Sequence, residues 1–253
     1  MNTEFDKKVY QQFMELFIIP EIKDRQAKNE LPRPLDLHAG QIIFFPDGRS
    51  PLVRINNEVK AIGKIKLKNN VKKNVGDPIY ESEVEGLENA KLMEDDFQDC
   101  GHATLIKFGD IWTITFDFSY NKDLSKKHLD TAIEFYELAE FAHKKNHWSA
   151  FIDNSFSAVE LTAKAILLGM PDKDLLKKAT HKGIHVKFNR FASLGNVKEE
   201  HKDVFNKLHR MRGIARYLKK DLALSETEAD EIMEMVKEMI DIANGRLKVS
   251  NEI

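Results

Sequence analysis

The chain has 253 residues, of which 42% are hydrophobic and 32% are charged, and its formal net charge is -2 at pH 7. This length suits one large domain or two of ordinary size, and the balanced charge argues against a nucleic-acid coat or a membrane-surface protein. The single cysteine, Cys100, excludes a disulfide or a thiolate zinc cluster within one chain. No segment approaches the run of about 18 apolar residues that a membrane helix requires. We therefore expect a cytoplasmic protein without membrane association, metal or cofactor, with domains at residues 1–120 and 124–248.

The first half is predicted to be an α+β domain, a helix plus a small antiparallel sheet. Apolar residues at helical spacing predict a helix over residues 3–28, which Pro20 either bends or ends. Alternating apolar and polar residues then predict short strands. These strands cover residues 41–45, 51–56, 58–68, 102–108 and 111–118. The first three are expected to form a meander and the last two a hairpin.

Turn residues separate these strands. Pro46-Asp47-Gly48 and Asn56-Asn57 are predicted turns within the meander, and Gly109-Asp110 is the predicted hairpin turn.

Two charged segments accompany the strands. Lys60, Lys64, Lys66 and Lys68 fall on one face of the third strand, either as a nucleic-acid surface or as the wet face of a sheet. Residues 81–99 contain eight acids, so we expect an exposed loop or short helix there rather than a packed strand. Its paired acids, Asp95 and Asp96, are either solvated or bind a divalent ion, and no EF-hand spacing supports the latter.

After Asp123 the spacing of apolar residues becomes helical and remains so, which predicts an all-α five-helix bundle. The predicted helices cover about 125–144, 147–168, 181–194, a segment opening at Asn196, and a last segment from Ser225 to Gly245. Asn196 with Glu199, and Ser225 with Glu228, have the spacing of capping boxes.

The fourth predicted helix contains a basic stretch, LHRMRGIARYLKK, at residues 208–220. At about 100° per residue its side chains form two stripes. The apolar stripe contains Val204, Leu208, Met211, Ala215 and Leu218, and the basic strip beside it contains His209, Arg212, Arg216 and Lys220. The strip either faces a cleft or a partner, or consists of arginines that extend over the bundle surface into solvent.

Three segments in order resemble the HEPN family (higher eukaryotes and prokaryotes nucleotide-binding) over about residues 125–247. They are FSAVELTAKAILL on the second helix, THKGIHVKFNRFASLG at the third, and LHRMRGIARYLKKDLALSETEADEI across the fourth and fifth. The resemblance implies a helical bundle that pairs with a second copy through its fourth helix. Many members are ribonucleases that use an arginine followed, after four to six residues, by a histidine. Others lack the histidine and bind nucleotides or protein partners.

In this chain Arg212 matches the family arginine, but Tyr217 occupies the first position where the histidine is expected. The only literal match to the spacing, Arg33 to His38, lies in the proline-rich connector rather than on a helix. Tyrosine, with an unperturbed pKa of about 10, is poorly suited to proton transfer near neutral pH. His181, His185 and His209 remain as candidates to replace the histidine.

The resemblance also assigns Glu160 to the acidic position of the second helix. There it either orients Arg212 across the bundle or pairs with Lys164 one turn later. The ligand-binding candidates are Arg212, Arg216, Tyr217, His209, Glu160 and Lys164. No catalytic residue is assigned.

The functional expectation is a non-catalytic module. It would bind a nucleotide, RNA or a protein partner, as a homodimer, in a prokaryotic toxin–antitoxin or phage-defence context. The alternatives are a metal-independent endoribonuclease with an unusual acid–base group and a structural dimerisation scaffold.

Overall fold

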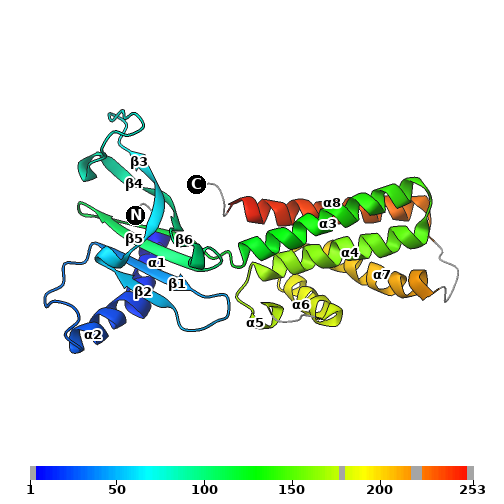
Figure 1. Ribbon diagram of the computed structural model, residues 1–253, viewed down its shortest axis with the longest axis horizontal. Coiled ribbons are helices and arrows are strands. Elements are labelled where there is room, and N and C mark those ends of the chain that lie inside the picture. Colours follow the sequence, from blue (N-terminus) through cyan, green and yellow to red (C-terminus); the bar gives the residue numbers. More distant parts are fainter. Residues whose placement is uncertain (1–3, 177–179, 218–223, 250–253) are drawn as a thin grey trace. The chain divides into compact units, whose positions relative to one another are not determined.

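The computed structural model describes residues 4–176, 180–217 and 224–249 (Figure 1). Contacts between residues divide the chain after Tyr120 into two compact units.

A long helical segment begins the first unit. It consists of α1 (Glu4–Phe13), a π-helical segment (Met14–Ile18) and α2 (Ile19–Ala27) without interruption. The predicted helix is therefore confirmed, and Pro20 does not end it. Pro20 is tolerated because it lies in the first turn of α2, directly after the π-helical segment, where the regular hydrogen-bond ladder is already altered.

This helical segment packs on a four-stranded antiparallel sheet with the strand order β2-β1-β5-β6. The strands are β1 (Ala39–Phe44), β2 (Leu52–Ile55), β5 (Gly101–Phe108) and β6 (Ile111–Asp117). Ile18 is fully buried against the sheet, and a Cβ on Gly40 would lie only 2.9 Å from its Cδ1 atom. Gly40 therefore lets the helix approach β1 closely, and the contact gives this unit its core.

The two predicted glycine turns of this sheet are confirmed, whereas the predicted Asn56-Asn57 turn is a 3-10 helix, Asn56–Glu58, that leads out of the sheet. Gly48 and Gly109 have φ values of 74° and 59°, which glycine adopts without strain. Asn56 has a φ of 54°, and its Nδ2 donates to the carbonyl oxygen of Asp36 at 2.8 Å. The β5–β6 hairpin forms as predicted around Gly109.

The predicted three-stranded meander is wrong, because the third strand does not pair with the second. β3 (Ala61–Leu67) pairs instead with β4 (Val84–Leu92) in a separate two-stranded sheet. The prediction of a loop or short helix over residues 81–99 is also wrong, since β4 lies inside that acidic segment. The strand packs because Val84, Ala90 and Leu92 are buried while its acids are not.

Lysines of β3 and glutamates of β4 neutralise one another across this β3–β4 ribbon. Lys64 lies 3.4 Å from Glu88, and Lys66 lies 2.7 Å from Glu85. The pairing supports the interpretation of the lysine row as the wet face of a sheet, not as a nucleic-acid surface. Asp95 begins a 3-10 turn after β4, and no group of three metal-ligating side chains occurs in the described part of the chain.

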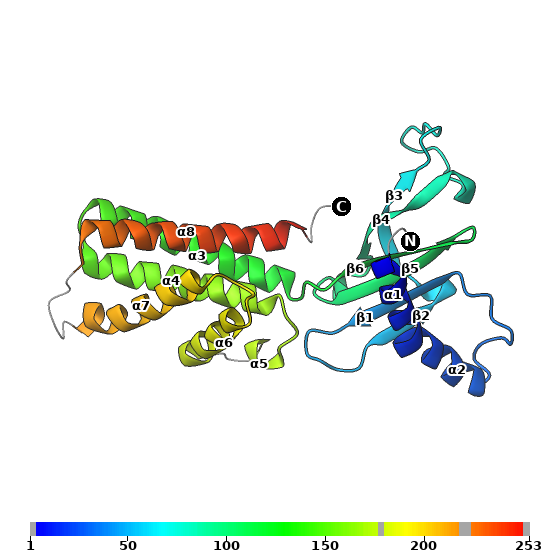
Figure 2. The same cartoon turned by 180° about the vertical axis from the view of Figure 1, so that it is seen from behind.

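The second unit is entirely helical over its described residues, as predicted. Its helices are α3 (Lys122–Lys144), α4 (Trp148–Leu168), α5 (Lys173–Leu176), α6 (His181–Ser193), α7 (Glu199–Tyr217) and α8 (Glu226–Val249). The five longer helices correspond to the five predicted ones, and the short α5 is additional. α4 is buried along most of its length and packs against α3, α6, α7 and α8 (Figure 2). None of the described helices combines the length and apolar composition needed to cross a bilayer.

The predicted helix caps are confirmed at α8 but not at α7. The backbone N–H of Glu228 donates to Ser225 Oγ at 3.2 Å, and that of Ser225 donates to Glu228 Oε2 at 3.2 Å. α7 begins at Glu199 rather than Asn196, because the Asn196 side chain donates to the carbonyl oxygen of Phe191 in α6. Thr180, which the sequence pattern did not single out, caps α6 by accepting a hydrogen bond from Gly183.

Candidate functional site

One face of the helical unit gathers ionisable side chains from three helices. Its α4 residues are spaced three and four apart, as are those of α7, so each set occupies one side of its helix. We call the following set the arginine–histidine face: Asp153, Phe156 and Glu160 of α4, His181 and His185 of α6, and His209, Arg212 and Arg216 of α7.

Asp153 holds both arginines of this face. Its Oδ1 accepts hydrogen bonds from Arg212 Nε at 2.9 Å and Arg216 Nε at 2.7 Å, and its Oδ2 accepts from Arg216 Nη2 at 2.9 Å. Burial alone would raise the pKa of Asp153, but the hydrogen bonds from Arg216 and Arg212 outweigh burial and keep that pKa below its usual value. One carboxylate thus faces two guanidinium groups, and the cluster retains a positive charge.

The Arg212 side chain is held in place, but only its Nε donates a hydrogen bond among the described residues. Its guanidinium carbon lies 4.3 Å from the centre of the Phe156 ring, a cation–π distance, and its side chain is 19% exposed. Its two Nη groups make no hydrogen bond among the described residues. A guanidinium whose outer edge is unoccupied presents the donor geometry that phosphate and carboxylate groups accept.

Glu160 does not reach Arg212, so the expected Glu160–Arg212 pair is wrong. Both Glu160 oxygens instead accept from His181 Nδ1, at 2.6 and 2.7 Å. The carboxylate is buried, whereas the His181 side chain is 69% exposed. A carboxylate that binds the Nδ1 proton leaves Nε2 of a neutral imidazole as the basic nitrogen, which orients His181 as a proton acceptor.

His185 and His209 join α6 to α7. Their ring centroids lie 4.5 Å apart, and the rings are nearly parallel. Partial burial and, next, the neighbouring His185 ring lower the pKa of His209. The Nε2 atom of His185 is buried without a hydrogen-bond partner in the described part of the chain.

The ion pairs of Asp153 and Glu160 do not include the other candidates among the described residues. Lys164 forms no ion pair with Glu160; together with burial, its charge lowers the pKa of His128 on α3. Tyr217 is 69% exposed at the described end of α7. Lys220 and Leu218, expected to continue the two stripes, fall outside the described residues. The structure therefore brings together Arg212, Arg216, His209 and Glu160.

Asp153 and Phe156 were missed by the sequence reasoning. Both lie on the same side of α4 as Glu160, at helical spacings of seven and four residues. An acid at that spacing, two turns before Glu160, was the available signal that Arg212 had a second possible partner.

The family comparison agrees with this architecture. The model of the HEPN domain matches residues 125–246, a little less than half of the chain, within the helical unit. The helical unit is a HEPN domain. No curated protein and no solved structure matches the chain significantly.

In this HEPN domain, the histidines nearest to Arg212 do not follow it by the four to six residues that the family spacing requires. Tyr217 follows Arg212 on α7, whereas His209 precedes it and His185 lies on α6. The HEPN domain therefore combines two arginines, two stacked imidazoles and a carboxylate-bound imidazole on one face.

Proposed function

We propose that the arginine–histidine face binds the phosphate groups of a nucleotide or RNA without cleaving it. The observation that carries this proposal is the clamp of Arg212 and Arg216 around Asp153, in which the outer edge of Arg212 has no partner among the described residues. Two guanidinium groups fixed by one carboxylate lose little conformational freedom when an anion binds. Phe156 and the His185–His209 stack hold the neighbouring helices together beside that clamp.

Calorimetric titration with a nucleoside diphosphate and with a short single-stranded RNA tests this proposal. Replacing Arg212 and Arg216 by alanine is expected to weaken binding of at least one probe by about tenfold or more. Arg210→Ala is the matched control, because Arg210 is exposed on the same helix and makes no side-chain contact with Asp153. An equal loss of binding in the Arg210 variant would show that the effect arises from net charge alone and would overturn the proposal.

A second candidate function, metal-independent RNA cleavage, is favoured by the Glu160–His181 pair. An exposed imidazole whose tautomer is fixed by a buried carboxylate is oriented for proton transfer. Incubation with total RNA in the presence of a chelator, comparing wild type with His181→Ala and Glu160→Gln, separates the two candidates. Cleavage lost in both variants supports a ribonuclease, whereas RNA that stays intact with wild type supports binding alone.

The proposal includes pairing with a second copy through α7, as the family resemblance implies. Sedimentation at concentrations on the order of tens of micromolar, where an association of ordinary affinity forms, is expected to show a dimer. A monomer under these conditions would contradict the part of the proposal that places a second copy against α7.

A further inference from the structure

A groove between α7 and α8 lies on the other side of α7 from the arginine–histidine face. The two helices run antiparallel, since His201 pairs with Glu238 at 3.1 Å and Lys207 pairs with Glu228 at 3.1 Å. The groove has a volume of about 520 Å³. At about 100° per residue, Asp203 and Lys207 point roughly half a turn away from Arg212 and Arg216. The groove is therefore independent of the proposed phosphate site.

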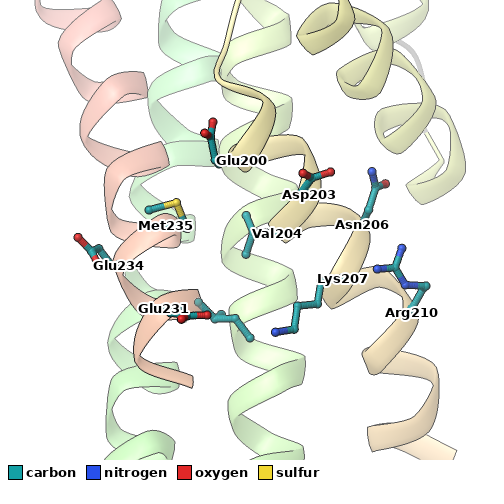
Figure 3. Close-up of a pocket in the computed structure, with 10 residues that line it drawn as sticks. Glu200, Asp203, Val204, Asn206, Lys207, Arg210, Glu231, Glu234 and Met235 are labelled. Carbon is teal, nitrogen blue, oxygen red and sulfur yellow. The ribbon is translucent and has the colours of Figure 1, made fainter. Parts of the chain in front are cut away.

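Apolar side chains form the floor of the groove. Val204 of α7 and Met235 of α8 lie between the two helices in Figure 3, and Ile232 completes the floor. On α7 the lining runs from Glu200 to Arg210, ten residues apart, a distance of roughly 15 Å along the helix. A shallow apolar channel of this length between two helices fits a short helix better than it fits a compact small molecule.

The charged rim is predominantly acidic. The groove is lined by four carboxylates, Glu200, Asp203, Glu231 and Glu234, and none of them forms an ion pair within the described residues. Lys207 is already paired with Glu228, which leaves Arg210 as the basic lining residue without an ion pair in that part of the chain. Among the described residues, four carboxylates without an ion pair against two basic lining residues leave the rim with an excess of negative charge.

The geometry points to a docking site for a basic amphipathic helix of a protein partner. The apolar stems of lysine and arginine side chains can cover the floor while their charged ends reach the rim carboxylates. Glu200 and Asp203 lie at one end, and Lys207 and Arg210 lie toward the other end together with Glu231 (Figure 3). The most basic part of the partner helix is therefore expected to lie against the beginning of α7.

The test uses the full chain and two synthetic peptides of about 14 residues, long enough to form a partial helix. Both carry the same leucines at helical spacing; one carries lysines beside them and the other glutamates. The groove variant combines Glu200→Gln, Asp203→Asn and Glu234→Gln. The control variant combines Glu134→Gln, Glu137→Gln and Glu226→Gln, which removes the same charge from exposed positions outside the groove. Thermal melts establish that both variants are folded.

The lysine peptide is expected to bind wild type and the control variant equally, and the groove variant about tenfold more weakly or worse, with the glutamate peptide weak throughout. Three results would overturn the proposal. The first is equal loss in the control variant, and the second is no preference for the lysine peptide. The third is a wild-type dimer that the groove variant alone converts to a monomer, which would make the groove a contact between copies of this chain.

Discussion

His185 stacks on His209 with ring centroids 4.5 Å apart and planes 24° from parallel. The stack sits beside a second ring pair, since His185 also meets Phe205 edge-on at 5.1 Å. Two imidazoles held this closely cannot both become protonated without repulsion. Together with partial burial, the neighbouring ring therefore favours the neutral form of His209.

Replacing His185 by glutamine is expected to raise the pKa of His209 toward its ordinary value, because the neighbouring ring is one of the causes that lower it. A nuclear magnetic resonance titration of the imidazole signals measures this directly. His147→Gln, at the start of α4 and outside the stack, is the control and leaves the His209 pKa unchanged. A His209 pKa that does not move in the His185 variant would contradict the interaction.

The same lowered pKa predicts how the folding stability changes with pH. The unfolded chain binds a proton at His209 near pH 6.5, whereas the folded chain binds it only at lower pH. The stabilising contribution is therefore present above about pH 6.5 and is lost as the pH falls through the lowered, folded-state pKa. His209→Gln is expected to flatten this part of the stability profile in denaturant melts, and a profile identical to wild type would contradict it.

Asp153→Asn is expected to move stability and phosphate affinity in opposite directions. The pKa of Asp153 is held below its usual value, so its carboxylate stabilises the fold above roughly pH 4 and this contribution is lost as the pH falls through the folded-state pKa. The variant removes it at pH 7, at a cost of about 1 kcal/mol, since the ion pairs are partly exposed. Binding of a nucleoside diphosphate is expected to strengthen, because the asparagine amide oxygen can still accept a hydrogen bond from the arginines while no internal negative charge competes with the phosphate. Melts and calorimetry measure the two effects, and weaker binding would contradict competition.

Arg212→Ala is expected to destabilise the protein by only about 1 kcal/mol, well below the roughly 3 kcal/mol expected for an arginine paired with a buried glutamate. Glu160 keeps His181 as its partner, and Asp153 keeps Arg216. A urea melt of the variant decides between the values. A loss near 3 kcal/mol would show that Arg212 supports the buried charge of Glu160 after all.

Ser225→Ala is expected to cost about 1 kcal/mol, because it removes the acceptor for the first turn of α8. Thr227→Ala provides a matched control, as Thr227 is exposed in the same turn. The difference between the two melting temperatures measures the cap. Equal melting temperatures would mean that the cap contributes nothing.

The helices were predictable because their signals are local. Apolar residues at helical spacing mark α4, and the Ser225–Glu228 box marks the start of α8. β4 was not predictable by the same reasoning, because its acids suggested an exposed segment. Their partners, Lys64 and Lys66, come from a strand about twenty residues earlier, and this pairing lets an acidic sequence form a strand whose apolar residues are buried.

The partner of Arg212 depended on tertiary information of another kind. Asp153 and Glu160 lie on the same side of α4, separated by seven residues, or roughly 10 Å along the axis. Which of them faces Arg212 depends on the relative position of α4 and α7 along their axes. Periodicity predicts the side of a helix on which a residue lies but not this axial position. Glu160 was therefore predicted as the partner of Arg212, two turns beyond the true partner, Asp153.

The exposed ion pairs of the β3–β4 ribbon give the first unit an element whose stability depends on ionic strength. The Debye length falls from about 10 Å at 0.1 M salt to about 3 Å at 1 M, so pairs such as Lys64–Glu88, at 3.4 Å and in contact with water, weaken. The buried contacts around Ile18 are apolar and are not screened in this way. Concentrated salt is therefore expected to weaken the ion pairs of the ribbon more than the apolar core of the four-stranded sheet and its helix.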